Sequence, residues 1–141
     1  MPSYPAILIA SSGAVAAYLG TVHLYYTFAT DKFFPRDPEL KRRLEVESPI
    51  LTRQLTMWKA WIGFHASHAL GLLLFGAVYV DLALFHRTVL LGSPVLLLVG
   101  AGWLLALLVI CKVYWFKGPF RGVALAGLMY LAGAISGLTW P

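Results

Sequence analysis

Two histidines in the segment "FHASHALG" are the residues of this chain best suited to chemistry. His65 and His68 stand three positions apart within a long apolar run, and an α-helix would place both on one face. A third histidine, His23, stands in an earlier apolar run. Imidazole ligates iron, copper, zinc and the magnesium of chlorins, and it also donates and accepts hydrogen bonds. The three histidines are therefore candidate cofactor ligands, with His65 and His68 as candidate metal ligands.

The composition predicts an integral membrane protein. The chain has 141 residues, of which 60% are hydrophobic and 12% charged, and its mean hydropathy is +0.76. A soluble domain carries about a quarter charged residues. Apolar residues gather in blocks of 20 or more, the length that a bilayer requires. We expect one transmembrane domain over residues 1–141. Its net charge of +5 is explained by membrane topology, and no nucleic-acid partner is expected.

Four apolar blocks predict an all-α fold, a four-helix transmembrane bundle. The predicted spans cover residues 5–28, 55–80, 89–114 and 120–140. In "RDPEL", Asp37 is a helix N-cap and Pro38 a first helical residue, which predicts a polar helix over about 38–48. In "SPIL", Ser48 and Pro49 repeat this signal and predict a start for the second long helix near Pro49. The segments "HRTVLLGSP" and "KGPFRG" are predicted to be short turns.

Positive charge predicts the orientation, because cytoplasmic loops carry the excess of lysine and arginine. Ten of the eleven basic residues flank the first and third loops, and Arg87 alone lies on the other side. Both termini are therefore expected on the non-cytoplasmic side. The predicted location is a bacterial inner membrane, crossed several times, with membrane lipids as partners.

Small residues and one heptad stripe indicate how the helices pack. Membrane helices approach closely through small side chains. Those noted here are Gly13, Ala16, Ala17, Gly20, Gly63, Ser67, Gly71, Gly122, Ala126, Gly133 and Gly137. The second span also carries large residues at alternating spacings of three and four, as in a coiled-coil core: Trp58, Trp61, His65, His68, Leu72, Phe75 and Tyr79. This stripe should face the bundle interior. The predicted pocket-lining residues are Trp58, Trp61, Gly20, Ser67 and Leu72.

Counting along the helices places His23 and His65 at one depth. At about 1.5 Å per residue, His23 lies roughly 12 Å from Asp31 and His65 roughly 13 Å from Thr56. Three interpretations of this centre stay open. The histidines ligate a haem, a chlorin or a metal ion; they hydrogen-bond a lipophilic molecule such as a quinone or sterol; or they bond one another, with Ser67, and only join the helices. Cys111 is expected to be an apolar filler and His86 a solvated loop residue.

Two resemblances bear on function. The stretch "MWKAWIGFHASHALGLLLFG", with "KVYWFKGPFRGVALAG", resembles small uncharacterised four-helix bacterial membrane proteins, which implies the fold. The polar loop "DPELKRRLEVESPILTRQ" also gives the chain a weaker similarity to the membrane-associated proteins of eicosanoid and glutathione metabolism. That family binds glutathione through arginine, asparagine and glutamate, for which Arg43, Glu47 and Arg53 could stand in. The asparagine is missing here and the spacing differs.

These observations predict a non-enzymatic accessory subunit with a buried histidine centre, associated with other membrane subunits or with itself. The alternative is a small membrane enzyme or binding protein for a lipophilic substrate, similar to a glutathione transferase. The motifs G-x-S-x-G, H-E-x-x-H and the P-loop are absent from the sequence, so no reaction is assigned.

Overall fold

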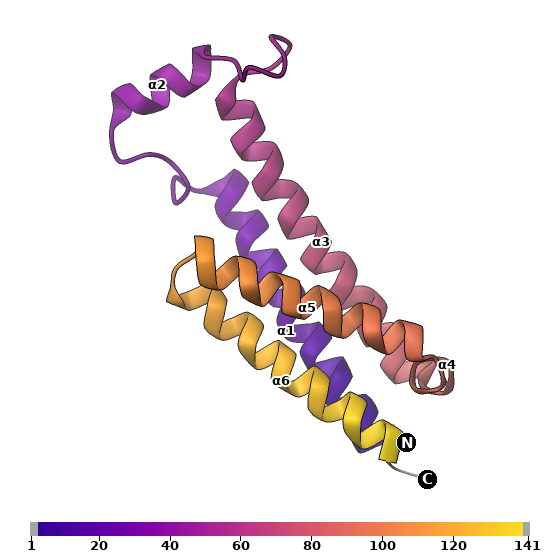
Figure 1. Ribbon diagram of the computed structural model, residues 1–141. Coiled ribbons are helices and arrows are strands. Elements are labelled where there is room, and N and C mark those ends of the chain that lie inside the picture. The colour runs from indigo at the N-terminus through magenta and orange to yellow at the C-terminus, as the bar shows by residue number, and fades with distance from the viewer. Residues whose placement is uncertain (1–2, 140–141) are drawn as a thin grey trace. The chain divides into compact units, whose positions relative to one another are not determined.

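The computed structural model describes residues 3–139, and every regular element in that range is a helix (Figure 1). The helices are α1 (Tyr4–Ala29), α2 (Pro38–Val46), α3 (Met57–Phe85), α4 (Arg87–Gly92), α5 (Pro94–Tyr114) and α6 (Lys117–Thr139). Four of them, α1, α3, α5 and α6, are long and apolar enough to cross a membrane. The predictions of an all-helical chain and of four apolar spans are thus confirmed. The last predicted span ended at residue 140, which lies outside the described residues.

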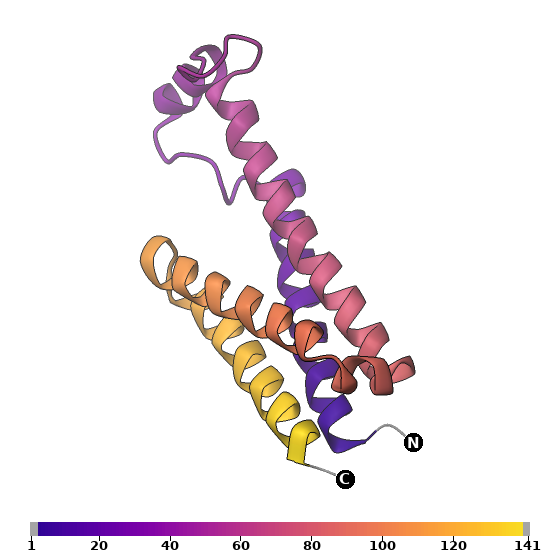
Figure 2. The same cartoon turned by 45° about the vertical axis from the view of Figure 1, so that its right-hand side comes forward.

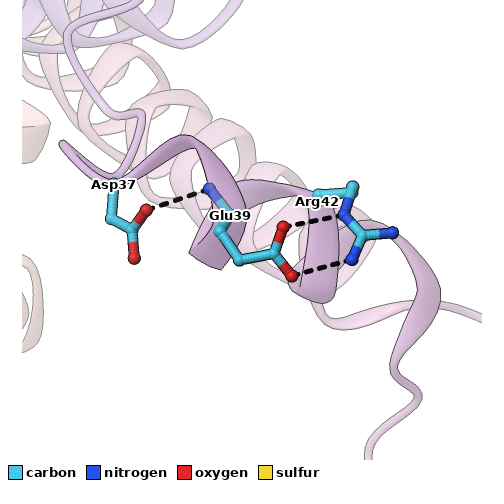
Figure 3. Close-up of polar contacts among 3 residues, drawn as sticks. All are labelled: Asp37, Glu39 and Arg42. Carbon is cyan, nitrogen blue, oxygen red and sulfur yellow. Dashed lines mark hydrogen bonds and ion pairs between the residues drawn. The ribbon is translucent and has the colours of Figure 1, made fainter.

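The polar helix α2 begins as predicted. The side chain of Asp37 accepts a hydrogen bond from the backbone N–H of Glu39 at 3.0 Å (Figure 3). Pro38 is the first helical residue. Arg42 donates two hydrogen bonds to the Glu39 carboxylate, at 2.8 and 2.9 Å. These bonds hold the pKa of the Glu39 carboxyl below its ordinary value. The helix ends at Val46, two residues before the predicted end.

The predicted helix start at Ser48 and Pro49 is wrong. Pro49 begins a turn, in which the N–H of Thr52 donates to the Pro49 carbonyl at 3.2 Å. The long helix α3 begins only at Met57. Thr56 precedes it, and its hydroxyl accepts from the N–H of Lys59 at 3.3 Å. Threonine is a good N-cap, so α3 starts at the cap that is followed at once by apolar residues.

The two predicted turns are also largely helical. Residues 87–92 form the short helix α4, and its Leu90 is fully buried. Ser93 then caps α5 by accepting from the N–H of Leu96 at 3.3 Å, so that span begins at 94 and not at 89. Helix α6 begins at Lys117, with Pro119 in its first turn, where proline needs no N–H partner.

The chain divides into two compact units, one of Met1–Leu19 with Leu72–Pro141 and one of Gly20–Gly71. In the first unit, α5 and α6 lie side by side and run in opposite directions (Figure 1, Figure 2). Two tyrosines stabilise the core of this unit: the hydroxyl of Tyr79 donates to the Leu96 carbonyl at 2.7 Å, and that of Tyr130 lies 3.1 Å from the Leu97 carbonyl. Tyrosine hydroxyls thus satisfy polar atoms inside an apolar core.

Small residues of α1 and α6 pack as predicted. Gly133 lies against the Pro5 backbone, where an added Cβ would be 2.7 Å from the carbonyl oxygen. Ser12 donates to the Ala126 carbonyl at 2.7 Å. The small residues of α3 behave otherwise. Gly63 and Ser67 are exposed, whereas Gly76, which the sequence analysis did not single out, lies against α1 with its hypothetical Cβ 2.6 Å from the Gly13 carbonyl oxygen.

Candidate functional site: a histidine cluster

His23 of α1 and His65 of α3 bond each other directly. Nε2 of His23 lies 2.9 Å from Nδ1 of His65, and the ring centroids are 5.1 Å apart with 29° between the planes. In such a pair one neutral imidazole donates its N–H and the other accepts. The prediction that these two histidines meet is confirmed.

His68 completes the cluster. Its ring centroid lies 5.1 Å from that of His23, with 64° between the planes. His65 is 7% exposed, whereas His23 and His68 are partly buried. The three histidines that the sequence marked are therefore brought together by two helices of the unit Gly20–Gly71.

An aromatic residue from the loop after α1 covers this cluster. The ring of Phe33 stacks on His65 with centroids 4.1 Å apart and 14° between the planes, and it lies 4.8 Å from His23. The indole N–H of Trp61 donates to the Phe33 carbonyl at 3.0 Å, and the Trp61 ring meets His65 edge-on at 4.4 Å. Phe33 and Trp61 thus enclose His65, and the Trp61 bond fixes the loop over it.

Threonines at the end of α1 set the position of this loop. Thr27 is buried, and its hydroxyl donates to the His23 carbonyl at 2.8 Å. The Thr30 hydroxyl accepts from the N–H of Lys32 at 3.2 Å. A turn follows, in which the N–H of Phe34 donates to the Asp31 carbonyl at 2.9 Å. A side-chain bond such as that of Thr30 competes with continued helix, and the turn that follows leads to Phe33, whose ring lies 4.8 Å from that of His23.

The predicted lining residues have different positions. Trp61 contacts the cluster, as described above. Trp58 meets the ring of Phe34 at 5.0 Å, and Lys41 of α2 lies over both of these rings, at 4.9 Å from Phe34 and 5.0 Å from Trp58. Gly20 is buried. Ser67 is exposed, and its hydroxyl donates to the Phe64 carbonyl of its own helix at 3.0 Å. Leu72 is buried in the other unit.

Sequence reasoning missed Phe33. It stands in "DKFFPRD", a polar segment between two helices, and nothing in a helical period marks it. The available signal was the pair of adjacent aromatic residues before a proline in an otherwise charged segment. An apolar ring there needs an apolar surface to cover.

The distance between His23 and His65 limits which group they can share. A tetrapyrrole metal bonded by both nitrogens from opposite sides, with bonds of about 2 Å, needs them about 4 Å apart. The observed 2.9 Å leaves no room for a tetrapyrrole between these residues as placed. A small ion bonded to both at a tetrahedral angle needs about 3.3 Å, which requires only a slight opening. Within residues 3–139, no group of three or more His, Cys, Asp or Glu side chains is arranged to hold a metal ion.

Comparisons of this chain with protein-family models, with curated proteins and with solved structures return no match.

Proposed function

We propose that this protein is a multi-pass membrane protein of the bacterial inner membrane, an accessory subunit whose histidine cluster binds a single transition-metal ion. Its four long helices form one bundle with both termini on the non-cytoplasmic side. The observation that carries the metal proposal is the 2.9 Å approach of His23 Nε2 to His65 Nδ1. Two nitrogens from two helices point at one another, and an ion can replace the proton between them.

The ligand type favours zinc, copper, nickel or iron, for which imidazole is a preferred ligand. His23 and His65 supply two bonds. The other coordination positions of the ion are available to His68, whose ring adjoins His23, to water, or to a group from another subunit. Ionisable residues inside membrane spans often mark functional sites, because a polar side chain there needs a polar group or a ligand to bond.

The charges of the spans disfavour catalysis by a carboxylate, which agrees with an accessory role. Asp81 is the one carboxylate in the four long helices, it lies near the end of α3, and it is exposed. A carboxylate general acid or base has to lie within reach of the reacting atoms, and the one carboxylate of these helices lies 13 residues along α3 from His68.

Metal binding by the purified protein tests the proposal. The protein is prepared without a polyhistidine tag, stripped with a chelator, loaded with Zn²⁺ or Co²⁺ and desalted, and bound metal is measured by elemental analysis. We expect one ion per chain in the wild type. His65→Ala and His23→Ala should each lose it, whereas His86→Ala, which removes an exposed histidine, should keep it.

Retention of metal by both His23→Ala and His65→Ala, or no bound metal in the wild type, overturns the metal proposal. The orientation is tested separately by labelling cysteines placed at Thr88 and at Ser48 in sealed vesicles. A membrane-impermeant reagent added from the non-cytoplasmic side should label position 88 and leave position 48 unlabelled.

A further inference from the structure

The connection between α2 and α3, residues 47–56, displays two large aliphatic side chains. Ile50 is fully exposed and Leu51 is 93% exposed. The base of the connection is closed, because the N–H of Met57 donates to the Glu47 carbonyl at 2.8 Å. The turn from Pro49 to Thr52 holds the tip. Two apolar side chains are thus held outward on a hydrogen-bonded loop.

The charges of α3 indicate the height of this loop relative to a bilayer. Lys59 and Asp81 are the charged residues of that helix, and their separation of about 22 residues spans about 33 Å. The hydrocarbon core of a bilayer is about 30 Å thick, so Lys59 marks one boundary. Met57 precedes Lys59 by two residues and therefore lies at headgroup level. The closed base of the connection lies there as well.

The neighbouring elements agree with this height. Helix α2 and the connection lie together at the end of α3 where that helix begins (Figure 1, Figure 2). Exposed basic residues belong to the same region, Arg43 on α2 and Arg53 in the connection, beside the exposed carboxylates of Glu45 and Glu47. Apolar side chains beside basic ones are typical of segments that lie in a membrane interface.

We propose that Ile50 and Leu51 insert into the lipid leaflet beside α3 as an interfacial anchor, with Arg53 at the level of the lipid phosphates. The occupant of this apolar surface is phospholipid, because the loop base lies at headgroup level and the exposed Arg53 of the same loop matches anionic headgroups. The anchor would fix the depth of the first turns of α3, and with them the depth of Trp61 and His65. This inference rests on membrane insertion of α3 and is independent of metal binding.

Spin-label accessibility tests the anchor. Cys111, the one native cysteine, is replaced by Ala, and single cysteines are introduced as Ile50→Cys, Leu51→Cys and Ser48→Cys. Ser48 is the matched control, since it is an exposed polar residue of the same connection. Each nitroxide-labelled protein is placed in nanodiscs of phosphatidylcholine with phosphatidylglycerol. Power saturation is measured with oxygen, which partitions into lipid, and with a water-soluble nickel chelate.

Labels at positions 50 and 51 should be accessible to oxygen and shielded from the nickel chelate, and the label at 48 should show the reverse. Equal exposure to the chelate at all three positions overturns the proposal. Shielding of 50 and 51 that occurs in native membranes and disappears in nanodiscs also overturns it, because the occupant would then be a partner protein. Equal shielding of position 48 contradicts a localised anchor. None of these readings changes if the histidines bind no metal.

Discussion

Nε2 of His23 lies 2.9 Å from Nδ1 of His65, and the two residues come from helices separated by the whole first polar loop. The bond joins α1 to α3 through side chains that are polar in an apolar setting. Phe33 covers the outer face of this pair by stacking on His65. We therefore expect the His23–His65 bond to contribute to the association of α1 with α3.

A double-mutant cycle on this pair measures that contribution. His23→Ala, His65→Ala and the double variant are compared with wild type by unfolding in micelles with chelator present, so that metal does not contribute. Each single substitution should destabilise the protein by about 1–3 kcal/mol, since it removes the hydrogen bond between the two rings. The coupling energy should be about 1 kcal/mol, as for other hydrogen bonds between membrane helices. The exposed His86→Ala should change stability by less than about 0.5 kcal/mol, and strictly additive effects of the pair would refute an energetic bond.

Gly76 and Gly63 give a second, matched comparison on one helix. A Cβ at Gly76 would lie 2.6 Å from the Cβ of Ala17 and 2.6 Å from the Gly13 carbonyl oxygen, so Gly76→Ala must separate α1 from α3. We expect a loss of about 1–3 kcal/mol, the usual range for overpacking. Beyond its chain neighbours and the nearby backbone of its own helix, no described atom lies within 4 Å of a Cβ at Gly63, so Gly63→Ala should be neutral or slightly stabilising. Thermal unfolding in detergent compares the two, and equal losses would contradict the close contact at Gly76.

The sequence predicted the helices and the histidine pair because both follow from one-dimensional rules. Span length follows from bilayer thickness, and the depth of His23 and His65 follows from counting residues inward from the charged loop. Their meeting needed only that consecutive spans lie antiparallel. Asp37 was a reliable cap because its bond is local, reaching Glu39 two residues away.

The misplaced helix starts have a local physical reason. Ser93–Pro94 begins a helix whereas Ser48–Pro49 begins a turn. A long apolar run follows Pro94, whereas only two apolar residues separate Pro49 from Thr52. The hydroxyls of Thr52 and Thr56 then accept from the backbone N–H groups of Gln54 and Lys59. Threonine side chains that bond nearby backbone groups favour turns and caps over continued helix. The Ser–Pro pair alone therefore cannot predict whether later side chains compete for the backbone N–H groups.

The remaining errors concern which side of a helix faces a neighbour. The spacing of Gly63, Ser67 and Gly71 defines a stripe, yet Gly63 and Ser67 are exposed and Gly76 makes the close contact. A stripe of small residues carries no information about the partner helix, since its position depends on the whole arrangement. Phe33 was missed for the same reason: its stacking on His65 arises from a turn whose direction no periodicity encodes.

Tyr130 allows a test of the core in the other unit. Its hydroxyl lies 3.1 Å from the Leu97 carbonyl and 3.3 Å from the Leu96 carbonyl, and its side chain is fully buried. Tyr130→Phe keeps the ring and removes the donor, so we expect a loss of about 1 kcal/mol. The exposed Tyr25 provides the control, and Tyr25→Phe should have no measurable effect on the unfolding midpoint. A loss of equal size in both variants would show that the Tyr130 hydroxyl contributes nothing specific.

The pair formed by Glu39 and Arg42 predicts a pH dependence outside the membrane. Two hydrogen bonds from Arg42 favour the ionised carboxylate, which lowers the pKa of Glu39 in the folded chain. A lowered folded-state pKa means that the stabilisation of α2 is present above the unfolded-state pKa and is lost as the pH falls through the lowered folded-state value.

Carboxyl ¹³C NMR of Glu39 in the intact protein should therefore titrate below an ordinary glutamate. Arg42→Gln should return the midpoint toward the ordinary value, whereas Arg53→Gln, which changes an exposed arginine of the adjacent connection, should not. Because both groups are exposed, added salt should reduce the difference, and a Glu39 midpoint unaffected by Arg42→Gln would rule out the ion pair as its cause.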